Sequence, residues 1–291
     1  MAVDAKAVKT LREQTGAGIL DCKKALQETE GDLDKAAQYL REKGISKAEK
    51  KASRIAAEGL TNVVTKDNTA VIYELNAETD FVAKNDTFKA LLQRVGDTVV
   101  NSDAKNLDDA FALEMDGKPM DVAIKEASAK IGEKLTLRRL SVFEKTDSQN
   151  FGAYVHMGGK ISTLAIIEGG DEATARDIAM HVAAINPRYL DQDEISEEVI
   201  KEERTVLRNE ALNEGKPEHI VDKMVEGRLN KFLKEICLVN QPFVKNPDQT
   251  VKAFASEKGA EILKFERLEV GEGIEKRSDD FADEVKAQMK G

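Results

Sequence analysis

The chain has 291 residues, of which 41% are hydrophobic and 34% charged, and its formal net charge is -10. This length exceeds the usual size of a single domain, and the core is expected to be mostly aliphatic because Trp is absent. The acidic balance argues against DNA or RNA, whose binders carry a basic footprint, and favours a protein partner. No apolar run is long enough to span a membrane, and residues 1–10 lack a signal peptide's apolar region. We therefore expect a cytoplasmic protein with no membrane contact.

Residues 1–45 are predicted to form a small domain of three helices. Apolar residues recur at helical spacing in three stretches, and Gly16 and Gly18 separate the first stretch from the second. Glu30-Gly31-Asp32 indicates the end of one helix and the N-cap of the next. Few large apolar side chains are available, so the core is small and the domain suits a docking role.

Residues 46–58 are predicted to form a helical linker. They combine small alanines with four basic residues, Lys47, Lys50, Lys51 and Arg54. Such a cluster could contact phosphate, but a solvated helix face is the favoured interpretation.

The hydrophobic period changes after residue 58, and residues 59–145 are predicted to form the first of two core subdomains. Two stretches rich in β-branched residues flank a polar turn, which indicates a hairpin. Asp86 is expected to cap a helix with an apolar stripe. The other expected elements are strands over 60–65, 70–75 and 135–143 and a helix over 121–131.

A second strand, strand, helix pattern begins near Phe151, which suggests two related α+β subdomains with antiparallel sheets. The glycines of Met157-Gly158-Gly159-Lys160 mark another hairpin turn, and Asp171 is placed to cap the helix that follows. This second subdomain is predicted to comprise residues 146–190 and 236–272. Its last elements are expected to be a helix over 247–258 and a strand over 262–270.

Residues 191–235 are predicted to be an inserted helical hairpin with coiled-coil character. Two long charged helices flank Gly215-Lys216-Pro217, and Pro217 is well placed at a helix start. The hairpin could associate with a second copy, contact another protein or project into solvent, and the sequence does not choose among these. Residues 273–291 are predicted to be a C-terminal helical module with Phe281 and Val285 on its apolar face.

No cofactor or metal site is predicted. Gly158-Gly159-Lys160 lacks the spacing of a phosphate-binding loop and is followed by Ile161 instead of Ser or Thr. Asp177 and His181 could share a helix face, but two mixed ligands are weak support for a metal, so a packing histidine is favoured. The two cysteines, Cys22 and Cys237, are interpreted as reduced and structural.

Asp80 beside Phe81 is the most unusual feature of the sequence. Both residues fall in a connection between a strand and a helix. Phe81 could pack back on the following helix as a hydrophobic staple, or it could be an exposed anchor that enters a partner's crevice. Glu74, Glu78 and Asp80 also form an acidic group, so a hydrolase that uses Glu78 and Asp80 as acid and base is an alternative.

Several motifs give the chain a resemblance to the elongation factor Ts family. Residues 11–26, Leu-Arg-Glu-Gln-Thr-Gly-Ala-Gly-Ile-Leu-Asp-Cys-Lys-Lys-Ala-Leu, are similar to its amino-terminal signature. Residues 74–84, which contain Thr79-Asp80-Phe81-Val82, are similar to its second signature, although Ala77 stands where Cys or Ser is expected. Shorter similar motifs follow at 130–133, 180–184, 215–217, 224–228 and 241–244, so the resemblance extends nearly end to end.

The resemblance implies a fold and an activity. The implied fold is α+β: a three-helix domain like ubiquitin-associated modules, a core of two α+β subdomains, a helical hairpin and a C-terminal helix. The implied activity is guanine-nucleotide exchange on elongation factor Tu, bound in both its GDP and nucleotide-free states, without covalent chemistry or catalytic residues. In the family, Thr79, Asp80, Phe81 and Val82 would lie near the partner's magnesium site.

The same resemblance implies further contacts with elongation factor Tu. Phe281 and Val285 are added to these contacts on amphipathicity alone. The expected contact residues are Ile19, Leu20, Lys23, Ile131, Gly132, His156, Val244, Phe281 and Val285. Besides a hydrolase, the remaining alternative is an acidic helper protein that binds through residues 1–55 only.

Overall fold

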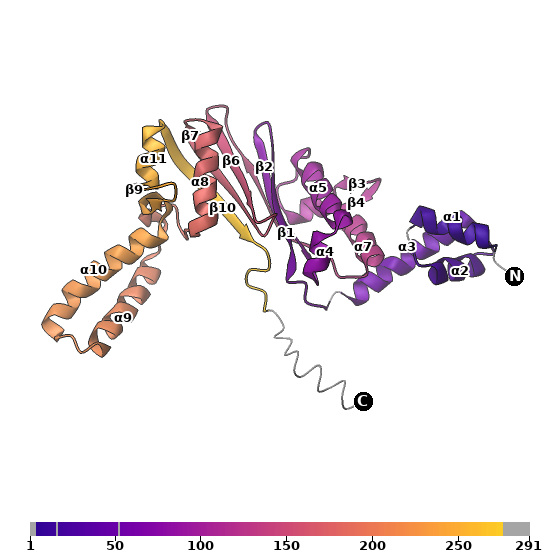
Figure 1. Cartoon of the computed structure of the whole chain (residues 1–291), viewed down its shortest axis with the longest axis horizontal. Helices are drawn as coiled ribbons and strands as arrows, with labels where there is room; N and C mark the ends of the chain where they lie inside the picture. Colours follow the sequence, from indigo (N-terminus) through magenta and orange to yellow (C-terminus); the bar gives the residue numbers. More distant parts are fainter. Residues whose placement is uncertain (1–3, 16, 52, 276–291) are drawn as a thin grey trace. The chain divides into compact units, whose positions relative to one another are not determined.

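The computed structural model describes residues 4–15, 17–51 and 53–275 (Figure 1). The chain divides into two compact units. Unit 1 contains Met1–Asn62, Tyr73–Val142 and the chain from Glu269, and unit 2 contains Val63–Ile72 and Phe143–Leu268. Two three-stranded sheets, ordered β1-β2-β5 and β10-β7-β6, together with the helices confirm the predicted α+β class.

The three-helix domain at the amino terminus is confirmed. Its helices are α1 (Ala5–Thr15), α2 (Ile19–Glu28) and α3 (Leu33–Lys50). Leu11, Cys22 and Leu26 are fully buried among them, so the small core comes from the predicted apolar spacing. The second helix ends at Glu28, and Gly31, with φ of 88°, turns the chain back so that its N–H donates to the Leu26 carbonyl at 2.8 Å. Asp32 caps the third helix by accepting a hydrogen bond from the Lys35 N–H at 3.0 Å.

The predicted linker is helical only in part. Helix α3 continues to Lys50, and the residues from Ser53 to Ala57 are turn and coil. Tertiary contacts account for the difference, because Lys51 donates to the Gly132 carbonyl and Arg54 pairs with Glu78 at 3.2 Å. These two contacts tie Lys51 and Arg54 to other parts of unit 1.

The first sheet follows this segment. Its strands are β1 (Glu58–Lys66), β2 (Thr69–Ala77) and β5 (Thr136–Glu144). The helices that accompany it are α4 (Asp80–Lys84), α5 (Asp86–Val100), α6 (Leu107–Ala112) and α7 (Met120–Ile131). A small hairpin of β3 (Glu114–Met115) and β4 (Lys118–Pro119) was not predicted, since two-residue strands have no period to detect.

The predicted cap of helix α5 is wrong by one residue. Asn85 is the N-cap, and its side chain accepts from the Thr87 N–H at 2.8 Å, while Asp86 is the first helical residue. The short helix α4 ends at Lys84 and leaves Asn85 extended, which frees its side chain for this role. The apolar stripe of α5 is confirmed, because Phe88, Leu91, Leu92, Val95 and Val99 are buried.

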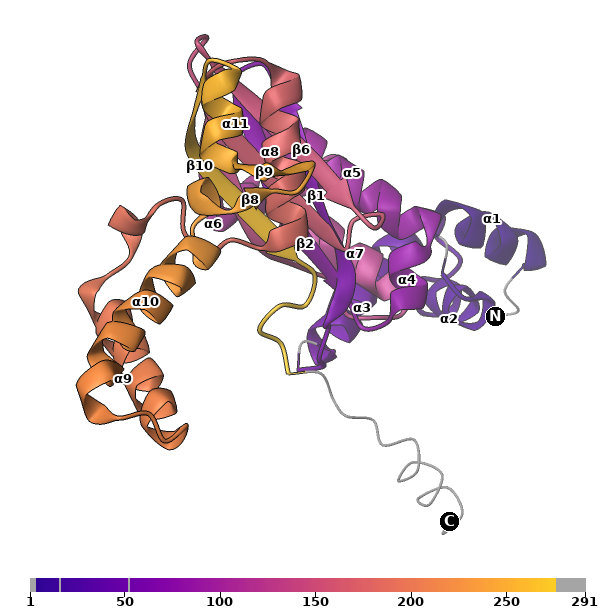
Figure 2. The ribbon, with the colours of Figure 1, turned by 60° about the vertical axis from the view of Figure 1, so that its left-hand side comes forward.

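The second sheet lies in unit 2 and is covered by helix α8 (Figure 2). Its strands are β6 (Gln149–His156), β7 (Ile161–Gly169) and β10 (Ala260–Glu269), and β6 pairs antiparallel with β7. Helix α8 (Glu172–Ile185) is capped as predicted, since Asp171 accepts from the Thr174 N–H at 2.7 Å.

The helix expected over 247–258 starts later than predicted. Residues of β9 (Asn246–Thr250) pair with β8 (Pro242–Phe243), and helix α11 (Val251–Glu257) begins after Thr250. Asn246 and Thr250 pair with Phe243 and Pro242 in this ladder, and Thr250 then caps α11 by accepting from the Ala253 N–H at 3.2 Å.

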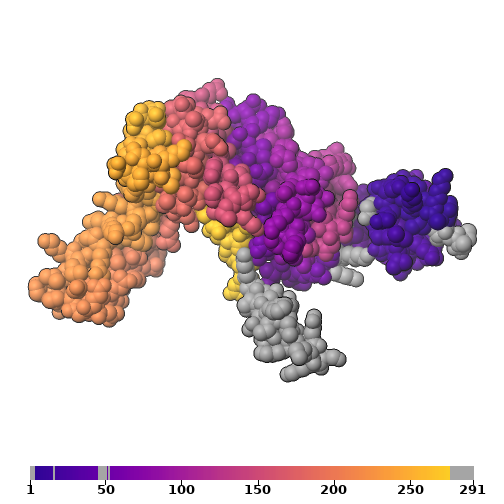
Figure 3. All heavy atoms as spheres, viewed as in Figure 1, coloured from indigo at the N-terminus to yellow at the C-terminus, as the bar shows by residue number. Residues whose placement is uncertain are grey.

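The helical hairpin is confirmed and consists of α9 (Glu197–Asn213) and α10 (Glu218–Ile236). Figure 3 shows it extending from the rest of unit 2. Buried apolar side chains from both helices form its seam, and they include Leu207, Ala211, Val221, Val225 and Leu229. Two short 3-10 helices, Gln192–Glu194 and Leu238–Asn240, flank the hairpin. Cys22 and Cys237 are unbridged and buried, which confirms their structural interpretation.

We expect Gly152→Ala to destabilise unit 2. A Cβ atom at Gly152 would lie 2.0 Å from the backbone carbonyl of Ala175, so strand β6 and helix α8 would have to separate, at a cost of about 1–3 kcal/mol. The matched control is Gly227→Ala in α10, which meets nothing within 4 Å and should gain up to about 1 kcal/mol. Urea unfolding of both variants checks this, and equal effects would contradict the packing described.

Candidate functional site

Residues 79–82 form an exposed corner between β2 and α5, which we call the finger. Thr79 is the N-cap of the short helix α4, and its hydroxyl oxygen accepts from the Val82 N–H at 3.4 Å. The Phe81 side chain is 80% exposed. A hydrophobic staple needs a buried ring, so that interpretation is wrong, and Phe81 presents its ring to solvent.

The carboxylate of Asp80 forms a surface ion pair within its own helix. Its Oδ2 lies 2.6 Å from Nζ of Lys84, one turn further along α4. Exposed pairs of this kind contribute only about 0.2–1 kcal/mol. Exchange of Lys84 for a polar group on a partner would therefore give up little from this ion pair.

The structure brings the finger together with Ile131 and Gly132. Helix α7 ends at Ile131, and Gly132 takes the left-handed conformation with φ of 93° as its C-cap. The next residue, Glu133, then accepts hydrogen bonds from the Thr79 N–H and hydroxyl. Glu133 was not predicted as a site residue, because carboxylates that reach across a fold leave no spacing signal in a sequence.

A second predicted group lies in the three-helix domain of unit 1. Ile19 and Leu20 occupy the first turn of α2 and are 55% and 82% exposed, and Lys23 is exposed on the next turn. Apolar residues this exposed at a helix start do not stabilise their own domain. They form a surface suited to contact with another protein.

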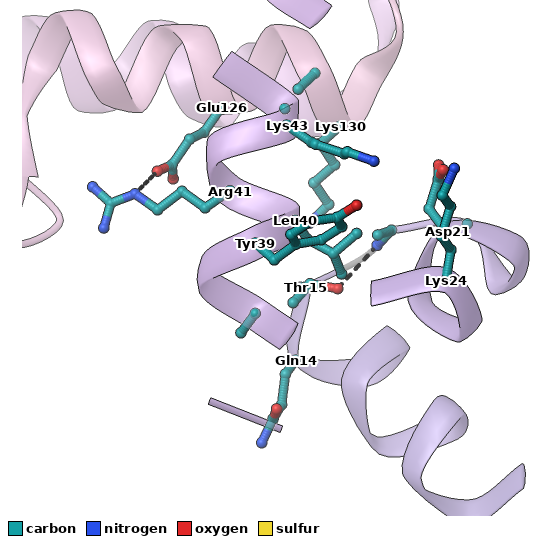
Figure 4. A pocket seen from close by; sticks show the side chains of 15 residues that line it. Gln14, Thr15, Asp21, Lys24, Tyr39, Leu40, Arg41, Lys43, Glu126 and Lys130 are labelled. Atoms are coloured by element: carbon teal, nitrogen blue, oxygen red, sulfur yellow. Dashed lines mark hydrogen bonds and ion pairs between the residues drawn. The ribbon is translucent and has the colours of Figure 1, made fainter. Parts of the chain in front are cut away.

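A pocket with a volume of about 370 Å³ lies in unit 1 (Figure 4). Its lining combines Tyr39 and Leu40 with Lys24 and Lys43, and an ion pair between Arg41 and Glu126 lies beside it. None of the described site residues lines this cavity. This pocket is therefore separate from the predicted contact residues that the structure describes.

His156 and Val244 belong to unit 2. His156 ends strand β6, where its Nδ1 lies 3.3 Å from the Tyr154 hydroxyl and the two rings stack at 5.9 Å. Its neighbours Val155 and Met157 are exposed. Val244 follows β8 with its side chain 39% exposed, so both predicted residues reach the surface of this unit.

The buried His181 fixes the backbone at Val244. Its Nδ1 accepts from the Val244 N–H at 3.1 Å, and its Nε2 lies 2.9 Å from Oε1 of Gln241. Nδ1 can accept only when the ring is neutral, which assigns the proton to Nε2. Burial lowers the pKa of His181 below its ordinary value, and the bond to Gln241 offsets part of that effect. His181 is fully buried, which confirms its interpretation as a packing residue. Asp177, the other residue considered as a metal ligand, forms an ion pair with Lys245 at 2.5 Å.

Glu74, the buried member of the acidic group, has structural partners. Glu74 is buried and pairs with Arg138 at 3.1 Å and with Arg139. Its burial raises the pKa, but hydrogen bonds from the Gly271 N–H, Asn76 and Arg139 outweigh burial and lower it overall. Glu74 is therefore held ionised as a structural group and is unsuited to donate a proton.

No helix in the described part of the chain combines the length and apolar character that crossing a bilayer requires. Within the same residues, no group of three or more His, Cys, Asp or Glu side chains is arranged to hold a metal ion.

An exposed aromatic on a capped turn, with an exposed apolar helix start on the same unit, is typical of surfaces that contact another protein. The sequence model of the family described as Elongation factor TS matches residues 78–272, well over half of the chain and inclusive of the finger. The protein belongs to the elongation factor Ts family. It is thus a nucleotide exchange factor for elongation factor Tu in translation elongation, and it does not catalyse covalent chemistry.

We expect Phe81→Ala to leave the fold as stable as before. The ring is mostly in water, so its removal should change the free energy of unfolding by less than about 0.5 kcal/mol. The matched variant Phe88→Ala removes a fully buried ring one helix further on and should cost about 3–5 kcal/mol. Thermal and urea unfolding compare the two. A large loss for Phe81→Ala would show that its ring packs on its own chain.

We expect the stability of unit 2 to fall as the pH drops below the ordinary His pKa of 6.5. The folded state holds His181 neutral while the unfolded chain takes up a proton, so the contribution is complete above 6.5 and is lost as pH falls towards the lowered folded pKa. Urea unfolding at pH 7.5 and 5.5 measures the difference, with His219→Gln as an exposed control. An NMR titration in which the His181 ring protonates at or above 6.5 would contradict this account.

Proposed function

We propose that the finger enters the G domain of elongation factor Tu beside its magnesium site and thereby promotes release of GDP. The observation that supports this proposal most directly is the 80% exposure of Phe81 on a turn that Thr79 caps. Large exposed aromatics are favoured interface anchors, because they bury much apolar area at little conformational cost. Asp80 beside the ring supplies a charge that can compete for polar contacts near the metal.

The proposed mechanism uses binding energy to open the partner's nucleotide site. G proteins hold GDP tightly through a phosphate cradle and a Mg²⁺ ion that bridges the phosphates. A wedge that shifts the helices around the metal weakens both contacts, and each tenfold gain in release needs about 1.4 kcal/mol. The interface can supply this only if it favours the open state of elongation factor Tu over the closed one. By reciprocity, nucleotide must weaken the complex, so exchange is reversible.

Other surfaces are proposed to share the binding energy. Ile19, Leu20 and Lys23 would contact the G domain, as would Ile131 and Gly132 beside the finger. His156 and Val244 would face domain 3 of elongation factor Tu. Phe281 and Val285, proposed for the C-terminal module, lie outside the described residues. Several separate contacts suit this task, because docking must offset the entropy of association before any energy is left to open the nucleotide site.

The remaining assignments are proposals of the same kind. Exposed Val206 and Leu212 on the hairpin support self-association through α9 and α10. The domain boundaries predicted from the sequence and a cytoplasmic location, where translation elongation takes place, complete the proposal.

The direct test is stopped-flow release of labelled GDP from elongation factor Tu. Wild-type protein should accelerate release, and Asp80→Ala/Phe81→Ala should lower the maximal rate at least about tenfold, which corresponds to about 1.4 kcal/mol. Leu263→Ala in β10 is the control, since it also removes an exposed apolar side chain. A double variant as active as wild type would remove the finger from the mechanism. The exchange activity would then have to depend on the other contacts.

A further inference from the structure

At the base of the finger, two glutamates from different segments each accept hydrogen bonds from the residue that follows the other. Oε2 of Glu133 accepts from the Thr79 N–H at 3.0 Å, and its Oε1 accepts from the Thr79 hydroxyl at 2.7 Å. In return, Oε1 of Glu78 accepts from the Lys134 N–H at 2.6 Å. Each glutamate thus holds the residue that follows the other. We call the four residues Glu78, Thr79, Glu133 and Lys134 the glutamate clasp.

The clasp controls the cap of helix α4. The Thr79 hydroxyl has one proton, and donation of that proton to Glu133 directs a lone pair of the same oxygen towards the Val82 N–H. Hydrogen bonds to a carboxylate are roughly twice as strong as neutral ones, so the orientation of Thr79 is set by Glu133 more than by the cap itself. Without Glu133, the hydroxyl could rotate and the first turn of α4 would lose its fixed start.

Glu133 is itself held on a fixed base. It follows Gly132, whose left-handed conformation ends α7 and turns the chain towards β5. The Glu133 carbonyl accepts from the Ser128 hydroxyl at 2.5 Å, and Lys51 Nζ donates to the Gly132 carbonyl at 2.5 Å. The far side of the clasp is held in a similar way, because Arg54 pairs with Glu78 at 3.2 Å.

The geometry points to Glu133 as a positioning residue for nucleotide exchange, an inference that rests on the proposed role of the finger. Phe81 is too exposed for contacts of its own ring to fix its direction, so the corner below it must do so. Phe81 can displace groups of the partner only if the residues that support it, the glutamate clasp, keep their positions. Misplacement of a working group by about 1 Å can cost on the order of 100-fold in rate, so a loosened clasp should slow release without abolishing docking.

The test measures GDP release from elongation factor Tu with Glu133→Ala, Glu133→Gln and the exposed control Glu114→Ala in β3. Glu133→Ala should lower the maximal release rate about 10- to 100-fold while the half-saturating concentration stays within about twofold. Glu133→Gln keeps one acceptor oxygen and should lie between Glu133→Ala and wild type, and it replaces Glu133→Ala should that variant not fold. Glu114→Ala should match wild type.

A double-variant comparison separates positioning from general damage. In a Phe81→Ala background, Glu133→Ala should cause no further loss, because Glu133 acts only through the finger. Hydrogen exchange at the Val82 and Ala83 amides should also speed up in Glu133→Ala and not in Glu114→Ala. These two readouts would not respond in this way to a merely structural role.

The outcomes separate a failure of the positioning role of Glu133 from a failure of the proposed function of the finger. If Phe81→Ala slows release but Glu133→Ala does not, the inference is overturned and the proposed function stands. If the losses from Glu133→Ala and Phe81→Ala add, Glu133 acts elsewhere and the inference is again overturned. If Phe81→Ala releases GDP like wild type, the proposed function fails first, and the positioning role fails with it.

Discussion

The exposure of Phe81 is the constraint on which the site depends. Burying such a ring would contribute about 1.5–3 kcal/mol, and the fold leaves most of that unused. Polar contacts must then fix the direction of the side chain, because apolar packing does not. The cap from Thr79, the carboxylate of Glu133 and the C-cap of α7 at Gly132 supply those contacts. Because the backbone at Phe81 keeps the ring exposed to solvent, the ring is available to become buried in a partner protein.

Elsewhere in unit 1, a charge network around the buried Glu74 adds to the apolar core. Glu74 accepts from Arg138, Arg139 and the Gly271 N–H, and the two arginines also donate to the backbone carbonyls of Glu272 and Glu269. Through these hydrogen bonds, residues of β2 and β5 hold the backbone of residues 269–272, where the chain leaves β10. Removing one partner of such a buried network leaves an uncompensated charge, which makes the position of this segment specific.

Much of the fold follows from local rules that a sequence displays. The stripe of α5, the Asp171 cap and the turn of Met157, Gly158 and Gly159 are set by residues close in the chain, and each was predicted. The linker was mispredicted because Lys51 and Arg54 find distant partners in Gly132 and Glu78. The late start of α11 is a local error, because residues 246–250 join a ladder with β8 instead of a helix. Asp80 and Phe81 stood out in the sequence, the resemblance added Thr79 and Val82, and the exposure of Phe81 was one of two options that the sequence left open. Glu133 escaped prediction because its partner Thr79 lies 54 positions away.

Photocrosslinking from position 81 tests the central claim most directly. A benzophenone amino acid would replace Phe81 in the intact chain, and the protein would be irradiated with GDP-bound elongation factor Tu. A crosslink from position 263 serves as the control for chance contact, since Leu263 is also exposed. The account predicts adducts from position 81 in the partner's G domain, among the helices around the magnesium site. Adducts only within the exchange factor's own chain, or only in another domain of the partner, would contradict it.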